Sequence, residues 1–438
     1  MTDRQRAIVE AVERAETRIV ELLADLVRIP SVNPVWPDSR PRGEQELQEY
    51  LAGRLARSGF ETDLFEPDVE RLEKYRGRPG HQDGRTFVDR PDLCATLRGD
   101  GDAPSLMLAS HIDVVGVSED EEWSVDAFGG EVKDGYVWGR GSADMKGGAA
   151  CQLAAVEVLL DLGLKPGGDI VWASVVDEET GGMGTLAVVD RGYTADAAFM
   201  PEPTSRRIVP MCRGILWGEI VVPGRSSHIE IPQADWHAGG AVDAIAKGRL
   251  VLEAFDRLNA EWTRRPEKNH PLLPVPNQVY VSMFQAGQHP SSWAEQAKIT
   301  FDVQYTANEA DPSGVGGLVK EEVERCLAGV AASDPWLSEN PPQLVWTVDA
   351  NPGEVPADDP LLLVLQGACR DLGLDPELDG TGFHTDSSIL IDAGIPTVVF
   401  GPGEPDDAHQ VDERCSVRDL VDVTKAIALS IAEWGQWR

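Results

Sequence analysis

Basic residues are scarce in this chain. Its 438 residues include 39 Lys and Arg but 74 Asp and Glu, and the formal net charge at pH 7 is −35. Such an acidic surface repels the phosphates of nucleic acids and the headgroups of anionic membranes. We therefore expect no nucleic acid and no membrane among its partners.

Cysteine motifs and long apolar segments are also absent. The six cysteines are scattered without any C-x-x-C spacing, which argues against a disulfide scaffold or a structural zinc knuckle and favours reduced thiols. No apolar run approaches the length that spans a bilayer, and the N-terminal residues form an amphipathic helix pattern rather than the apolar core of a signal peptide. These absences predict a cytoplasmic protein.

Short apolar runs alternate with helical patterns over most of the chain. Apolar residues at helical spacing predict helices over 4–28, 44–58 and 145–162. Continuous apolar runs, which are typical of parallel strands covered on both faces, occupy 105–110, 170–176, 197–200 and 396–400. Strands that alternate with helices predict an α/β fold with a mainly parallel sheet between helices.

The segment between residues 212 and 351 has a different pattern. Strands are expected at 215–222, 278–284, 298–305 and 343–348, and helices at 238–258 and 314–328. This βαββαβ order is the signature of a small ferredoxin-like unit. We therefore predict a catalytic domain formed by residues 1–211 and 352–438, interrupted by a lid-like domain at 212–351.

Histidine and acidic residues follow the predicted strands. His111 and Asp113 come after strand 105–110, and the acidic run 177–179 comes after strand 170–176. Glu202 follows strand 197–200, and His409 follows strand 396–400 at a longer distance. Taken alone, each group is compatible with a solvated turn. Open α/β sheets, however, place ligands beyond the carboxyl ends of their strands, so their shared position favours one common site.

A glycine-rich turn at 137–148 supplies one more carboxylate, that of Asp144. The turn lacks the Walker spacing, which excludes a phosphate loop of that kind. The candidate ligands are then His111, Asp144, Glu179, Glu202 and His409. One bridging carboxylate with one histidine and one further carboxylate per ion makes two mixed nitrogen and oxygen sites, which suit zinc. Two such ions lie about 3.5–4 Å apart in sites for metal-assisted hydrolysis.

The ordered motifs SHIDVV, GRGSADMKGG, VVDEETGG, PEPT and GPGEPDDAHQVDE resemble those of the dinuclear zinc amidohydrolases. That family includes acetylornithine deacetylase, succinyl-diaminopimelate desuccinylase, aminoacylase and glutamate carboxypeptidase, and the likeness runs from about residue 23 to the C-terminus. It implies a zinc-peptidase-like fold in which Asp144 bridges the ions. His111 and Glu202 would complete one site, and Glu179 and His409 the other. Cobalt or manganese would fit the same ligands.

The resemblance also implies the remaining roles. Glu178 would be the general base that takes a proton from a metal-activated water and passes it to the leaving nitrogen. Asp113 would orient His111. The segment GRSSH at 224–228 matches a lid element of the family, so His228 would reach the substrate carbonyl. In the family this carbonyl often lies in the neighbouring subunit of a homodimer that forms through the lid. The alternative is that His228 is a structural histidine in a turn.

Substrate recognition is where the sequence departs from the family. The Asn and Arg that usually grip a substrate carboxylate are replaced by Ser291 and Gln304, and Ser387 and Ser388 follow Asp386 where an Arg is frequent. We expect an amidohydrolase that cleaves a small N-acyl amino acid or related amide; the alternatives are a dipeptidase or carboxypeptidase, or an amidase for uncharged amides. Another arginine (Arg206, Arg207, Arg213 or Arg225) is a further option for the carboxylate. The roles of His384 and of the polar loop 66–91 stay open.

Overall fold

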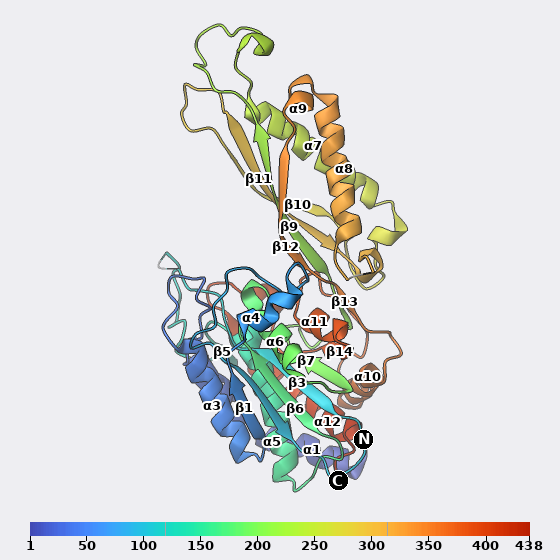
Figure 1. Ribbon diagram of the computed structural model, residues 1–438. Helices are drawn as coiled ribbons and strands as arrows, with labels where there is room; N and C mark the ends of the chain where they lie inside the picture. Colours follow the sequence, from blue (N-terminus) through green and yellow to red (C-terminus); the bar gives the residue numbers. More distant parts are fainter. Residues whose placement is uncertain (119, 313) are drawn as a thin grey trace. The chain divides into compact units, whose positions relative to one another are not determined.

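The computed structural model describes residues 1–118, 120–312 and 314–438, which divide into two compact units (Figure 1). The first, here called the core unit, contains Met1–Cys212, Glu354–Thr381 and Thr385–Arg438. The second, here called the insert unit, contains Arg213–Gly353 and Gly382–His384. The core unit is therefore built from segments on both sides of the insertion.

A six-stranded sheet forms the centre of the core unit. Its strands, in spatial order, are β1 (Glu61–Phe65), β2 (Asp92–Leu97), β6 (Ile170–Val175), β3 (Leu106–His111), β7 (Ala197–Met200) and β14 (Thr397–Val399). The last four are mutually parallel, whereas β2 runs antiparallel to both of its neighbours, β1 and β6. The carboxyl ends of β6, β3, β7 and β14 therefore meet at one edge of the sheet.

Helices cover both faces of this sheet. The helices of the core unit are α1 (Asp3–Arg14), α2 (Glu16–Val27), α3 (Gly43–Arg57), α4 (Val69–Leu72), α5 (Gly147–Asp161), α6 (Met183–Arg191), α10 (Pro360–Leu372), α11 (Ser387–Asp392) and α12 (Val417–Trp434). Along β3, Leu106 and Leu108 pack into a core shared with α2, α5 and α12. Met107, on the opposite face, packs with Val188 of α6 and Leu390 of α11. This arrangement explains why the strands have continuous apolar sequences.

Several short elements were not predicted from the sequence. They include β4 (Glu131–Lys133), β5 (Tyr136–Trp138) and β15 (Arg414–Ser416), which form a small sheet, and β8 (Met211–Cys212) and β13 (Gly353–Glu354). The strands β1 and β2 of the central sheet and the helix α6 were not predicted either. The predicted helix 4–28 is two helices, because a turn at Ala15 separates α1 from α2. The two chain termini lie at the same end of the core unit (Figure 1), where Arg4 donates to the carbonyl of Trp437.

The insert unit is an antiparallel sheet covered by helices. Its strands, in spatial order, are β10 (Val279–Ala286), β11 (Gln296–Tyr305), β9 (Gly214–Pro223) and β12 (Gln343–Ala350). Its helices are α7 (Ala244–Trp262), α8 (Gly317–Ser333) and α9 (Pro335–Glu339). Phe255 of α7, Val323 of α8 and Phe301 of β11 share one apolar core. The order of the elements is βαββαβ, as predicted.

The predicted fold class is confirmed: a mixed, mainly parallel sheet between helices carries a separate ferredoxin-like insertion. Among the described residues, no helix combines the length and the apolar character needed to cross a membrane.

Candidate metal centre

The edge where the parallel strands end collects the five predicted ligands. His111 is the last residue of β3, Glu179 follows β6, and Glu202 follows β7. Ligand atoms of His111, Asp144 and Glu202 all lie within 4.8 Å of one another, and so do those of Asp144, Glu179 and His409. Asp144 is the one residue common to both groups.

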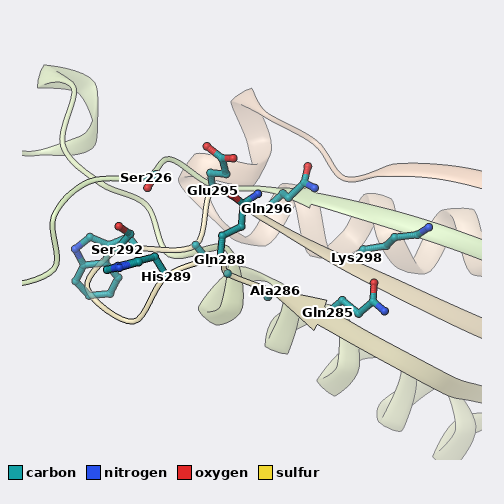
Figure 2. Close-up of a pocket in the computed structure, with 12 residues that line it drawn as sticks. Ser226, Gln285, Ala286, Gln288, His289, Ser292, Glu295, Gln296 and Lys298 are labelled. Carbon is teal, nitrogen blue, oxygen red and sulfur yellow. The ribbon is translucent and has the colours of Figure 1, made fainter.

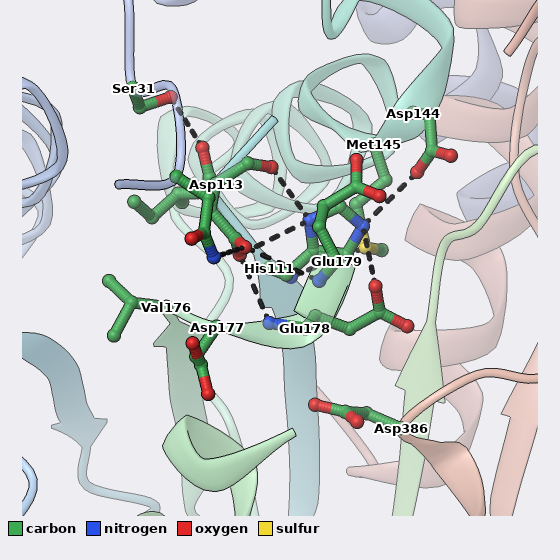
Figure 3. Close-up of polar contacts among 12 residues, drawn as sticks. Ser31, His111, Asp113, Asp144, Met145, Val176, Asp177, Glu178, Glu179 and Asp386 are labelled. Carbon is green, nitrogen blue, oxygen red and sulfur yellow. Dashed lines mark hydrogen bonds and ion pairs between the residues drawn. The ribbon is translucent and has the colours of Figure 1, made fainter. Parts of the chain in front are cut away.

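The first group surrounds the buried imidazole of His111. Its Nε2 atom lies 3.1 Å from Oδ1 of Asp144 and 3.7 Å from Oε2 of Glu202. Oε2 of Glu178 is 3.8 Å from the same nitrogen. Figure 3 shows the ring of His111 between Asp113 on one side and the carboxylates of Asp144 and Glu178 on the other. One imidazole nitrogen therefore faces three carboxylates.

The second group lies closer to solvent. Nε2 of His409 is 3.0 Å from Oε2 of Glu179 and 3.3 Å from Oδ2 of Asp144. The side chain of His409 is 49% exposed, whereas that of Glu179 is 5% exposed. Since the two oxygens of Asp144 face different histidines, its carboxylate lies between the two groups.

The turn that carries Asp144 is held by a buried ion pair. Oε1 of Glu413 accepts hydrogen bonds from the backbone N–H groups of Ala143, at 2.9 Å, and of Asp144, at 3.1 Å. Its Oε2 accepts from Nη1 of Arg140 at 2.8 Å, and both residues are 1% exposed. The helix predicted from Met145 begins only at Gly147 in the structure, after this turn. The role of Glu413 was not predicted, although it is the last residue of the fifth motif.

Two glycines, one after the turn of Asp144 and one after β14, allow their segments to approach the segment that carries Glu202. A Cβ atom on Gly148, at the start of α5, would lie 2.0 Å from the carbonyl oxygen of Pro201. A Cβ on Gly401 would lie 2.3 Å from the carbonyl oxygens of both Pro201 and Glu202. Neither contact is possible for a residue with a side chain, so glycine is required at both positions for this packing.

Asp113 holds the backbone of the two glutamates that follow β6. Its carboxylate accepts hydrogen bonds from the N–H of Glu178 at 3.2 Å and of Glu179 at 3.3 Å. The side chain of Asn33 donates to the same carboxylate at 2.9 Å. The Nδ1 atom of His111 lies 3.0 Å from the backbone oxygen of Asp113 and 3.7 Å from its carboxylate. The backbone carbonyl of Asp113 is therefore the closer partner of the imidazole.

Asp177, the first member of the acidic run, is not part of the cluster. Its backbone has a φ of 74°, and its side chain is directed away from His111 (Figure 3). The carboxylate lies 3.5 Å from Arg90 and 3.6 Å from Arg85. Two arginines that sequence analysis did not single out therefore compensate the charge of Asp177.

The electrostatics of the cluster fit divalent cations. Burial raises the pKa of Glu179 and of Glu202 to about 7. Burial would also raise the pKa of Asp144, but hydrogen bonds from His111 and His409 outweigh it and hold this pKa well below its usual range. Oε1 of Glu179 and Oε1 of Glu202 are buried and have no hydrogen-bond partner among the described residues. The donor set thus offers unpaired carboxylate oxygens and negative charge that two cations would neutralise.

The other predicted residues lie in the insert unit. His228 is exposed, in a loop after β9 that pairs with the loop before β11 at Ser292. Gln304, on β11, accepts a hydrogen bond from Arg213. Nδ1 of His384 lies 3.3 Å from the backbone oxygen of Arg213.

Comparisons with known proteins show the family to which the chain is similar. Residues 107–433 match the model of peptidase family M20/M25/M40. The chain is 30% identical over 440 residues to N-formyl-4-amino-5-aminomethyl-2-methylpyrimidine deformylase of Halalkalibacterium halodurans, covering 97% of this chain and 96% of that protein. It is 29% identical to succinyl-diaminopimelate desuccinylase of a Bradyrhizobium species, covering 93% of this chain and 97% of that protein. Among solved structures, the dipeptidase Dug1p of Saccharomyces cerevisiae superposes with a TM-score of 0.75 at 14% identity, over 100% of this chain and 99% of that one.

Proposed function

The chain belongs to peptidase family M20/M25/M40, a family of metal-dependent amidohydrolases and peptidases, and from that premise we propose that it hydrolyses a small N-acyl amide without a carboxylate, a formamide above all. The observation that carries the reaction type is the pair of donor groups that share Asp144. The proposed ligands and the proposed base are the residues that the motifs predicted, and the two donor groups support the ligands.

The site residues divide into ligands and a base. In the proposal His111 and Glu202 hold one ion, Glu179 and His409 hold the other, and Asp144 contacts both. Two divalent ions, zinc by preference and cobalt or manganese as substitutes, would polarise the amide carbonyl and acidify a water molecule.

Glu178 is the proposed general base. Its carboxylate is close to the cluster, 3.8 Å from His111, but it belongs to neither donor group. Burial and the neighbouring carboxylates raise its pKa well above the usual range, although His111 opposes this shift. Such a carboxyl group can accept a proton from the attacking water and release it to the leaving nitrogen. The hydrogen bond from its backbone N–H to Asp113 keeps it in place.

The insert unit is proposed to act as a lid and as the dimerisation domain. His228 would donate a hydrogen bond to the carbonyl oxygen of the substrate, in the site of the neighbouring subunit of a homodimer. Its exposure within the insert unit supports this role, because an exposed imidazole is free to meet another surface. We propose that the enzyme works in the cytoplasm on a small-molecule substrate.

The contacts of four arginines support a substrate without a carboxylate. Arg206 pairs with the carboxylates of two aspartates at 3.0 Å each, and Arg207 lies 3.5 Å from a third. Arg225 donates to two backbone carbonyls, and Arg213 donates to Gln304. All four are thus engaged within their own units, so they are poorly placed to replace the missing carboxylate-binding residues. An N-formylated aminomethylpyrimidine carries no carboxylate, whereas succinyl-diaminopimelate carries several.

A substrate panel on metal-loaded enzyme tests the proposal. It contains N-formyl-4-amino-5-aminomethyl-2-methylpyrimidine, an N-succinyl amino acid, a dipeptide, and one N-formyl amino acid with its carboxamide. We expect the highest kcat/KM for the formylpyrimidine, and a higher value for the carboxamide than for its free acid. A strong preference for the free acid or the N-succinyl compound would instead show that the substrate carboxylate is recognised.

A further inference from the structure

Lys146 is a buried residue of the GRGSADMKGG motif for which the chemistry above has no role. It is 1% exposed and lies two residues after Asp144. Its Nζ donates to the backbone oxygen of Leu26 at 3.1 Å and to that of Ile29 at 3.0 Å. Both carbonyls lie at or just beyond the C-terminal end of α2, where backbone oxygens carry partial negative charge. Lys146 therefore ties the turn that carries Asp144 to the end of this helix.

Residues 29–33, here called the brace, continue from this contact and pair with the chain next to Asp113. The N–H of Asn33 donates to the backbone oxygen of Val114 at 3.1 Å, and the N–H of Val114 donates to that of Ser31 at 3.1 Å. These two backbone hydrogen bonds form a short parallel ladder. The brace therefore connects the end of α2 with the segment that holds the two glutamates after β6.

Asn33 ends the brace beside the turn of those two glutamates. It is 1% exposed, and its amide donates to the carboxylate of Asp113 at 2.9 Å and to the hydroxyl of Thr180 at 3.1 Å. Both amide hydrogens are therefore in use, which fixes the side chain. Because Asp113 accepts from the N–H groups of Glu178 and Glu179, Asn33 ties the brace to their turn.

Gly141 lets the turn of Asp144 pack closely against these groups. Its φ is 82°, and a Cβ atom there would lie 2.6 Å from Cγ1 of Val114 and 3.1 Å from Cδ of Lys146. A residue with a side chain would therefore push away the lysine stem or the segment next to Asp113. Because packed interiors leave little free volume, a shift at either end of the brace displaces the neighbouring turn.

On the basis of the proposed function, we propose that the brace fixes the two halves of the metal centre relative to each other, with Lys146 and Asn33 as positioning residues at its ends. Lys146 sets the turn of the shared ligand Asp144, and Asn33 sets the turn of the base Glu178. Neither positioning residue belongs to the two donor groups. A displacement of about 1 Å in an active site lowers the rate about 100-fold, so the spacing between the base and the shared ligand has to be held.

A double-mutant cycle with Co²⁺ as the probe tests this assignment. Full-length apo-protein is titrated with Co²⁺, and the visible spectrum of the bound ion reports affinity and coordination geometry without any substrate. We expect Lys146→Met and Asn33→Leu each to lower the affinity about tenfold, as the loss of a residue that supports metal ligands does, and to change the spectrum. The double variant should also lose about tenfold, because either substitution releases the same brace, whereas two independent supports would lose about 100-fold together.

Matched controls come from the insert unit. Lys268 and Asn277 are a buried lysine and a buried asparagine, each 1% exposed, and both contact Glu309. Lys268→Met and Asn277→Leu should lower the Tm but leave the affinity for Co²⁺ and the spectrum unchanged. A polar pocket of the same unit is lined by His289 and Glu295 (Figure 2), whose nitrogen and oxygen donors also suit Co²⁺. His289→Ala should therefore change only weak binding outside the cluster.

Turnover at saturating Co²⁺ completes the test. Since neither positioning residue touches the proposed substrate, kcat should fall about tenfold or more while KM changes less than about twofold. A loss of about 100-fold in the double variant, or unchanged affinity and spectrum in both single variants, would overturn the brace while leaving the hydrolase proposal intact. The expected cycle in Co²⁺ affinity supports the brace even if no formamide is hydrolysed. If Lys146→Met does not fold, Asn33→Leu decides alone through its affinity and spectrum.

Discussion

Replacing Glu413 by glutamine should loosen both metal sites at once. The carboxylate of Glu413 accepts from the backbone of Ala143 and Asp144 with one oxygen and from Arg140 with the other. A glutamine amide has one oxygen, so either the two N–H groups or the guanidinium must face an NH₂ group. Arg140 is 1% exposed and would lose its closest carboxylate in a buried setting.

The expected magnitudes follow from that geometry. Breaking a buried ion pair by removing one charge costs about 3 kcal/mol, which lowers the Tm of a chain of this size by roughly 3 °C. Residues that support metal ligands typically contribute about 10- to 100-fold in affinity. Because the Asp144 carboxylate belongs to both donor groups, Glu413→Gln should weaken both binding steps in a calorimetric titration of apo-protein with Zn²⁺.

Glu157→Gln is the matched control. Glu157 accepts two hydrogen bonds from Arg54, at 2.7 and 2.9 Å, and the two side chains are 11% and 17% exposed. It lies on α5 ten residues beyond Gly147, about 15 Å along the helix. The control should lower the Tm without changing metal affinity. Unchanged affinity in Glu413→Gln, or an equal loss in Glu157→Gln, would refute a specific support of Asp144 by Glu413.

Three other predictions concern the cluster itself. Asp144→Ala should lose both metal ions, whereas Glu202→Gln and Glu179→Gln should each lose mainly one. The metal content of each variant after dialysis tests this prediction. Two ions retained by Asp144→Ala would exclude Asp144 as a shared ligand. Glu178→Gln should keep both ions but lower kcat by about 10²- to 10⁴-fold, and unchanged turnover would remove this residue from proton transfer. Treatment with a chelator should abolish hydrolysis, and adding back Zn²⁺, Co²⁺ or Mn²⁺ should restore it, as followed by initial rates.

The strand pattern predicted the position of the site because parallel strands impose a strong constraint. Once β3, β6, β7 and β14 are parallel neighbours, the residues after them must meet at one edge. Continuous apolar runs identified these strands, since both faces of the sheet are covered. His111 shows the limit of the method, because it belongs to β3 although its polarity placed it just after the strand.

Some of the missed elements are too short to show a period. The strands β4, β5 and β15 have three residues each, too few for any alternation to be recognised. The break between α1 and α2 escaped prediction for a different reason. Val12 and Ile19 are seven residues apart, and both are buried, so the apolar stripe continues on the same face through the turn at Ala15.

The acidic run after β6 shows why sequence proximity misleads about charge. Asp177, Glu178 and Glu179 are consecutive, yet Asp177 turns toward Arg85 and Arg90. Both arginines come from the polar loop 66–91, whose role sequence analysis left open. Arg85 also donates to the backbone oxygen of Thr180, and Arg90 lies in a buried pair with Glu44. These contacts place the end of this loop against the turn that carries Glu178, so the loop borders the site. The arginines that compensate the charge of Asp177 therefore lie about ninety residues away from it in the sequence.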